Sequence, residues 1–204
     1  MLLHYIYDPL CGWCYGSAPL LAAAQDEGFK IALHAGGMMM GPNRQRASTI
    51  RQFVLTHDQR MSEMSGQPIG DAYRNDFLSD PEAVFDSEPP TVAILAAEES
   101  GNGLHMLERI QRARFIEGRH IAKPAVLAEL ADELEIAEFE NAYDRWVGAK
   151  TMQHIETSRA LLHKVGGQGF PTFVLESNGG LRMLNSATYL GRVEPWRAML
   201  KTLA

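Results

Sequence analysis

The stretch Asp8-Pro-Leu-Cys11-Gly-Trp-Cys14-Tyr-Gly16 places two cysteines, with two residues between them, directly after an apolar segment that predicts a strand and at the start of a predicted helix. The first turn of a helix carries unpaired backbone N–H groups and a partial positive charge, and both stabilise a thiolate. Cys11 is therefore the candidate nucleophile. Cys14 lies one turn further along and is the candidate resolving thiol, which attacks a mixed disulfide at Cys11 and releases the product.

The chain has 204 residues and no other cysteine. Two alternatives to redox chemistry for this pair are a zinc site and a structural disulfide. A zinc site needs four ligands, and we expect no metal because neither a second CxxC nor histidines at paired spacing supply them. A structural disulfide that closes so short a loop adds little stability. Gly12 and Trp13 form a tight spacer at a helix start, and Trp13 is expected to contact substrate or to shield Cys14. Redox chemistry is the favoured interpretation.

The composition is that of an ordinary globular protein, with 46% hydrophobic residues and 19 Lys and Arg against 25 Asp and Glu. We expect no nucleic-acid partner, because no segment supplies the basic stripe that phosphate binding needs. We expect no membrane span, since no window approaches about 20 apolar residues. No Lys or Arg precedes Lys30, which argues against a signal peptide and favours a cytoplasmic protein. No apolar stripe is left over for an interface, so a monomer is expected.

Apolar and helical patterns divide the chain into two β-containing ends and a helical middle. Strands are predicted over 2–7 and 30–35, on either side of a helix over 12–26 that Pro19 should kink. The C-terminal end predicts strands over 172–175 and 181–184 around a turn at 177–180, and a helix over 194–203. Between them, helices are predicted over 44–65, 89–100, 104–117, 125–134 and 137–165, with Gly148 as a candidate break. The two ends must meet in one sheet, so the middle is an insertion in an α/β protein.

A second motif, Gly166-Gly-Gln-Gly-Phe-Pro171-Thr-Phe-Val-Leu, places a proline directly before a strand. Proline statistics alone give a cis bond there a chance of about 5%. With this motif, the CxxC and the stretch Phe115–Ala131, the chain resembles the thioredoxin-fold DsbA family. It is most similar to the cytoplasmic DsbA-like branch of protein-disulfide isomerases, which includes FrnE-type proteins.

The resemblance implies a thioredoxin-like fold with a large all-helical insertion after the second strand. Residues 1–37 and 166–204 would form the thioredoxin-like domain, and residues 38–165 the insertion. Cys11 would be the nucleophile and Cys14 the resolving thiol. Pro171 would be cis and would pack beside the CxxC. Phe170 would offer its backbone groups to a substrate segment, as in strand pairing, so that the implied substrate-binding residues are Trp13, Phe170 and Pro171.

The chain also departs from the family pattern. Many strongly oxidising relatives carry a histidine between the cysteines, whereas the spacer here is uncharged, so we expect a weaker oxidant. Thioredoxin-like proteins often hold a buried acid on the first strand, but Tyr5 and Ile6 stand there. Asp8 is the acid nearby, and we interpret it as a plain turn residue. The run Met38–Met40 either fills the core, the favoured interpretation, or lines an apolar substrate groove.

The resulting function is a thiol-disulfide oxidoreductase that reduces or isomerises disulfides in the reducing cytosol. Its partners would be protein thiols and disulfides or glutathione, with no cofactor beyond the redox-active pair and glutathione as a candidate co-substrate. One alternative is a glutathione-dependent isomerase or transferase, of the 2-hydroxychromene-2-carboxylate isomerase or kappa type, acting on a small molecule. The presence of Cys14 argues against it. A non-catalytic interaction protein is a third interpretation, which a reactive Cys11 disfavours.

Overall fold

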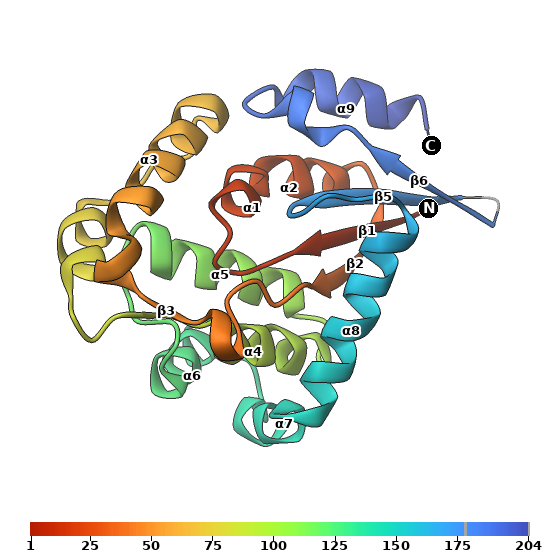
Figure 1. The fold of residues 1–204 in the computed structure, drawn as a ribbon. Coiled ribbons are helices and arrows are strands. Elements are labelled where there is room, and N and C mark those ends of the chain that lie inside the picture. The colour runs from red at the N-terminus through yellow and green to blue at the C-terminus, as the bar shows by residue number, and fades with distance from the viewer. Residues whose placement is uncertain (178, 204) are drawn as a thin grey trace.

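A central four-stranded sheet brings the two ends of the chain together (Figure 1). The structure is a computed structural model that describes residues 1–177 and 179–203. The strand order is β2-β1-β5-β6, in which β1 (Leu2–Tyr7) pairs in parallel with β2 (Lys30–Ala35). The strand β5 (Thr172–Ser177) runs antiparallel to both β1 and β6 (Gly180–Leu184). The predicted sheet is confirmed, while residue 178 of the predicted turn lies outside the described residues.

The helix between β1 and β2 is divided in two, as the sequence predicts. α1 (Gly12–Gly16) and α2 (Ala18–Asp26) meet at Ser17. Pro19 stands in the first turn of α2, where its missing N–H breaks no helical hydrogen bond. The kink ends one helix close to the cysteines and starts the next.

The segment between β2 and β5 is helical, as expected. Its helices are α3 (Ala47–Ser65), α4 (Glu88–Glu98), α5 (Gly103–Phe115), α6 (Pro124–Glu133), α7 (Phe139–Trp146) and α8 (Ala149–Lys164). The predicted helix over 137–165 divides at Gly148 into α7 and α8. After the sheet, α9 (Val193–Lys201) ends the fold. None of the helices in the described part of the chain is both long enough and apolar enough to cross a membrane.

Several short elements were not predicted, because segments of two to five residues have no periodicity to detect. Strands β3 (Gln45–Arg46) and β4 (Val84–Phe85) pair with each other, so the helix predicted to start at residue 44 starts at Ala47. The other short elements are η1 (Gly41–Asn43), η2 (Ala72–Asp76), η3 (Phe77–Ser79) and η4 (Ser186–Tyr189).

Aromatic packing fixes α2 and α9 on one face of the sheet. Tyr5 of β1 contacts Phe173 of β5 with ring centroids 4.8 Å apart, and Trp196 of α9 packs edge-on against Phe173 at 5.4 Å. The indole of Trp196 is fully buried and donates to the carbonyl of Leu20 in α2 at 2.8 Å. Helices α4 to α7 lie on the side of the sheet away from α9 (Figure 1).

Three histidines join β1, β2 and α8 on the other face, because neighbouring strand residues point to opposite sides. His4 and His34 share a hydrogen bond of 2.9 Å, and His154 of α8 accepts one from the backbone N–H of Ala35 at 3.1 Å. Burial, with smaller contributions from His4 and His154, lowers the pKa of His34 from 6.5 to about 4. His34 is therefore neutral in the folded protein at neutral pH.

This group predicts a loss of stability in acid. A histidine with a lowered folded-state pKa stabilises the protein above pH 6.5, and that contribution is lost as the pH falls to about 4. Since His34 is only half-buried, we expect a loss of about 1–2 kcal/mol rather than the full value of the shift. Urea unfolding at pH 7 and pH 4.5 should show a smaller loss for His34→Gln than for the wild type. The exposed control His105→Gln should behave as the wild type. Equal losses in all three proteins would contradict the prediction.

Candidate active site

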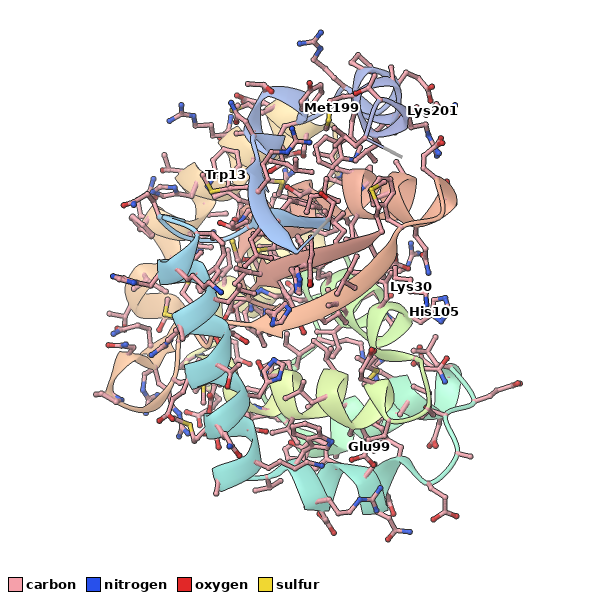
Figure 2. The ribbon with its side chains drawn as sticks, turned by 90° about the vertical axis from the view of Figure 1, so that its right-hand side faces the viewer. Trp13, Lys30, Glu99, His105, Met199 and Lys201 are labelled. Atoms are coloured by element: carbon pink, nitrogen blue, oxygen red, sulfur yellow. The ribbon has the colours of Figure 1, made fainter. Side chains whose placement is uncertain are left out.

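The two cysteines lie at the carboxyl ends of β1 and β2, the edge at which ligands bind in open α/β sheets. Cys11 caps α1 with an extended backbone, φ −73° and ψ 117°. Figure 2 shows Trp13 at the opposite end of the sheet from Lys30, the first residue of β2. The strand-to-helix turn thus presents the CxxC at one end of the molecule.

The two thiols differ in burial. Both are free, with Cys11 6% exposed and Cys14, within α1, fully buried. Burial raises the pKa of the Cys14 thiol well above its usual range, and the contact with Cys11 adds to the increase. Tyr5 holds this turn by donating its hydroxyl to the carbonyl of Cys14 at 3.2 Å. The difference favours Cys11 as the attacking sulfur and Cys14 as a thiol kept protonated in reserve.

The proline motif packs against Cys11. The bond between Phe170 and Pro171 is cis, as the resemblance implies. The Cys11 thiol donates to the carbonyl oxygen of Phe170, with 3.5 Å between sulfur and oxygen. A group that binds covalently to Cys11 would release this carbonyl, which could then accept a hydrogen bond from the bound segment.

Phe170 is supported by the loop after β2. Its ring lies against Gly36, where a Cβ atom would overlap the ring. Arg159 of α8 fixes this loop, because its Nε donates to the carbonyl of Gly36 at 2.8 Å and its Nη2 to that of Gly37 at 2.7 Å. Arg159 was not predicted from the sequence, since no local pattern relates it to residues more than 120 positions earlier.

Asp8 is a fully buried clamp, so its interpretation as a plain turn residue is wrong. Its Oδ1 accepts the backbone N–H of Leu10 at 2.9 Å and the hydroxyl of Ser87 at 3.0 Å. Its Oδ2 accepts the N–H of Met38 at 2.6 Å. Ser87, at the start of α4, in turn accepts the N–H of Met39 at 2.9 Å. The carboxylate therefore joins the loop before α1 to the loop after β2 and to the insertion.

Replacing Asp8 with Asn should destabilise the fold, because the amide turns one acceptor into a donor that faces another donor. We expect a loss of about 1–3 kcal/mol at pH 7. Burial raises the pKa of Asp8, so the carboxyl group of Asp8 binds a proton more tightly in the folded state than in the unfolded state. The wild type therefore gains stability over the variant as the pH falls through the folded-state pKa towards about 4.

Urea unfolding of the wild type and Asp8→Asn at pH 7 and pH 5 measures both effects. The exposed change Asp132→Asn is the matched control. The free energy of unfolding of Asp8→Asn should be lower than that of the wild type by more than about 0.5 kcal/mol at pH 7. A smaller difference at pH 7, or a difference that decreases at pH 5, would show that Asp8 is not the clamp described.

A cavity of about 290 Å³ opens beside Cys11. Met38 and Met39 line it, whereas Met40 is buried against Gly37, so the geometry supports a groove for the first two and core filling for the third. Phe53 of α3 stands at the cavity with 64% of its surface exposed. Trp13 also lines the cavity and is half-buried. Apolar surface from the insertion therefore borders the attacking sulfur.

A buried polar chain forms another part of the cavity wall. Oδ1 of Asp58 faces Gly12, where a Cβ atom would overlap it. The hydroxyl of Tyr73 donates to Oδ2 of Asp58 at 2.8 Å, and Nη2 of Arg114 donates to that hydroxyl at 3.3 Å. These three residues, which come from α3, η2 and α5, were not predicted from the sequence. Glycine in the CxxC spacer is the signal that could have indicated a close neighbour.

The contact between Gly12 and Asp58 predicts a coupled effect on stability. Gly12→Ala should lower the free energy of unfolding by about 1–3 kcal/mol, because the added methyl group has no room. In an Asp58→Ala background, Gly12→Ala should lower the free energy of unfolding much less. A double-mutant cycle measured by urea unfolding isolates this coupling. Additive effects would mean that the two residues do not oppose each other.

No metal centre is evident in the described ranges, 1–177 and 179–203, where no three or more His, Cys, Asp or Glu side chains gather in a group that could hold an ion.

Comparisons with known proteins agree along the whole chain. A family described as the DSBA-like thioredoxin domain matches residues 3–192. The chain is 48% identical to the cytosolic disulfide reductase DsbM from Pseudomonas aeruginosa, with a TM-score of 0.94 over 100% of this chain and 98% of that one. The structure of the same reductase with glutathione gives 47% identity and a TM-score of 0.92 over the same shares of the two chains.

A 2-hydroxychromene-2-carboxylate isomerase is 17% identical, with a TM-score of 0.62 over 100% of this chain and 97% of that one. At that identity the likeness concerns the fold alone. No curated protein matches the sequence.

Proposed function

Since the chain belongs to the DSBA-like thioredoxin domain family and is a thiol-disulfide oxidoreductase of DsbA type, we propose that it reduces disulfides in the cytosol with electrons from glutathione. The predicted family and fold are confirmed by the match over residues 3–192. The observation that carries the proposal is the full-length similarity, at 48% identity, to a cytosolic disulfide reductase whose structure is also known with glutathione.

The first step takes place at Cys11, at the cavity. Its thiolate attacks one sulfur of the substrate disulfide, so that a bond forms between Cys11 and that sulfur while the substrate S–S bond breaks. The other half of the substrate leaves as a thiolate and takes up a proton. Departure of Cys11 from its contact with Phe170 frees the carbonyl of that residue. We assign Trp13, Phe170 and Pro171 to substrate contact on this basis.

The second step uses Cys14. Its sulfur attacks that of Cys11, which forms the Cys11–Cys14 disulfide and expels the remaining half of the substrate as a thiolate. The proton of Cys14 passes to that leaving thiolate, and two electrons have moved from the dithiol to the substrate. Burial keeps Cys14 protonated until the mixed disulfide lies next to it. Two glutathione molecules then restore the dithiol, and they leave joined by a disulfide.

The sheet and the helical segment have separate tasks in this scheme. Residues 1–37 and 166–204 would form the thioredoxin-like domain that carries both cysteines and Pro171. Residues 38–165 would form the insertion domain that contributes Met38, Met39 and Phe53 to the cavity. We propose that the protein acts as a monomer. The alternative of a small-molecule isomerase or transferase has only the shared fold in its favour, and the buried second thiol favours the dithiol reaction.

A trapping experiment tests the proposal. In Cys14→Ser the mixed disulfide at Cys11 has no internal route of release, so oxidised glutathione should leave one glutathione bound per protein, detected by intact-mass spectrometry. Cys11→Ser should form no adduct, because burial protects Cys14. The wild type should instead form its internal disulfide. Absence of the adduct in Cys14→Ser, or an equal adduct in Cys11→Ser, would contradict the assignment.

A further inference from the structure

A carboxylate of the insertion lies beside the attacking cysteine. We propose that Asp58 is a positioning residue whose negative charge destabilises the Cys11 thiolate and so keeps the Cys11–Cys14 pair a reductant. The inference rests on the proposed function only in taking Cys11 as the attacking sulfur. It assigns a redox-setting role to a residue outside the CxxC and outside the proline motif.

The position of Asp58 is fixed by close packing. Its side chain comes from the middle of α3 and is 6% exposed. One carboxylate oxygen faces Gly12, the residue next to Cys11, closely enough that a methyl group would not fit between them. Asp58 and Cys11 line the same cavity. A charge on Asp58 is therefore felt at Cys11 through protein and a narrow cavity rather than through bulk water.

Among the described residues, the carboxylate of Asp58 forms no direct ion pair. Tyr73 donates to it at 2.8 Å, and the positive charge of Arg114 lies one residue further on, donating to the Tyr73 hydroxyl at 3.3 Å. The guanidinium of Arg114 sits 4.1 Å above the ring of Phe85. Its Nε and Nη1 have no hydrogen-bond partner in the described part of the chain. Arg114 therefore compensates the charge of Asp58 only from a distance.

Other ionisable groups near this wall have different roles. Asp8 commits both carboxylate oxygens to three hydrogen bonds, one of them from the N–H of Leu10 next to Cys11. His57, next to Asp58 on α3, is exposed at the cavity. Since Gly12 and Trp13 are uncharged, the CxxC spacer itself brings no charge to Cys11. Asp58 is the carboxylate that packs against Gly12, inside the CxxC spacer, and that lines the cavity together with Cys11.

The direction of the effect follows from electrostatics. A nearby negative charge disfavours a thiolate. A less stable thiolate makes the reduced pair less stable relative to its disulfide, whereas the strongly oxidising DsbA has an unusually stable reduced form. Asp58 therefore acts in the direction opposite to a histidine in the spacer. It makes the dithiol a better donor of electrons.

Asp58→Asn tests this, because it removes the charge and keeps the shape and an oxygen for Tyr73. Burial raises the pKa of Asp58, so the comparison is made at pH 7, where the carboxylate is more fully charged than in acid. The rate of Cys11 alkylation by iodoacetamide should then increase about three- to tenfold as more thiolate forms. The equilibrium with reduced and oxidised glutathione should shift towards the reduced protein, and most strongly at a pH high enough for Cys11 to be a thiolate. Glu63→Gln, the same loss of charge on the exposed face of α3, should leave both within about twofold of the wild type.

The outcomes separate this inference from the proposed function. If Asp58→Asn matches Glu63→Gln in both measurements, or moves the other way, the inference is overturned. Asp58→Ser, which is smaller and also uncharged, gives the same test if the Asn variant fails to fold. A merely structural role would lower stability without moving the pH profile of alkylation. If the wild type does not exchange with glutathione, the proposed function fails, while the alkylation profile still decides the role of Asp58.

Discussion

The buried carboxylate of Asp8 is the contact on which the arrangement of the active site depends. It ends β1, and its hydrogen bonds reach the turn that carries Cys11, the loop after β2 and the first residue before α4. A buried carboxylate without such donors would be costly, so the three segments must stay together for the charge to remain satisfied. The sheet and the helical insertion therefore meet at a fixed position beside the cysteines.

The contact between the sheet and the helical insertion determines which residues fit in the active-site loops. Gly12 leaves room for Asp58 of α3, and Gly36 leaves room for the ring of Phe170. Arg159 of α8 fixes the loop after β2 that contains Gly36. A side chain at either glycine would push the insertion or the proline loop away from Cys11. The insertion thus shapes the site as much as the sheet does, since it contributes apolar cavity wall and the charged side chains of Asp58 and Arg114.

The sequence predicted the features that depend on local pattern, and it did not predict the contacts between residues far apart in the chain. Apolar alternation predicted β1 and β2, the CxxC at a helix start predicted the unequal thiols, and the family resemblance predicted the cis bond at Pro171. An acid followed by proline is a common turn, so nothing local indicates that Asp8 accepts three hydrogen bonds from separate segments. Asp58 and Arg159 lie in ordinary amphipathic helices, and only the fold brings them to the site.

Three features favour an electron donor over an oxidant: Cys14 is buried as a thiol, the spacer is uncharged and a carboxylate packs on the turn of Cys11. The reduction potential of the wild-type Cys11–Cys14 pair tests that claim most directly. It is measured by equilibrating the protein with defined mixtures of reduced and oxidised glutathione and by counting free thiols after an acid quench. The account predicts a potential of about −200 mV or lower, in the range of glutaredoxins and thioredoxin. A value near about −120 mV, as in the oxidant DsbA, would contradict it.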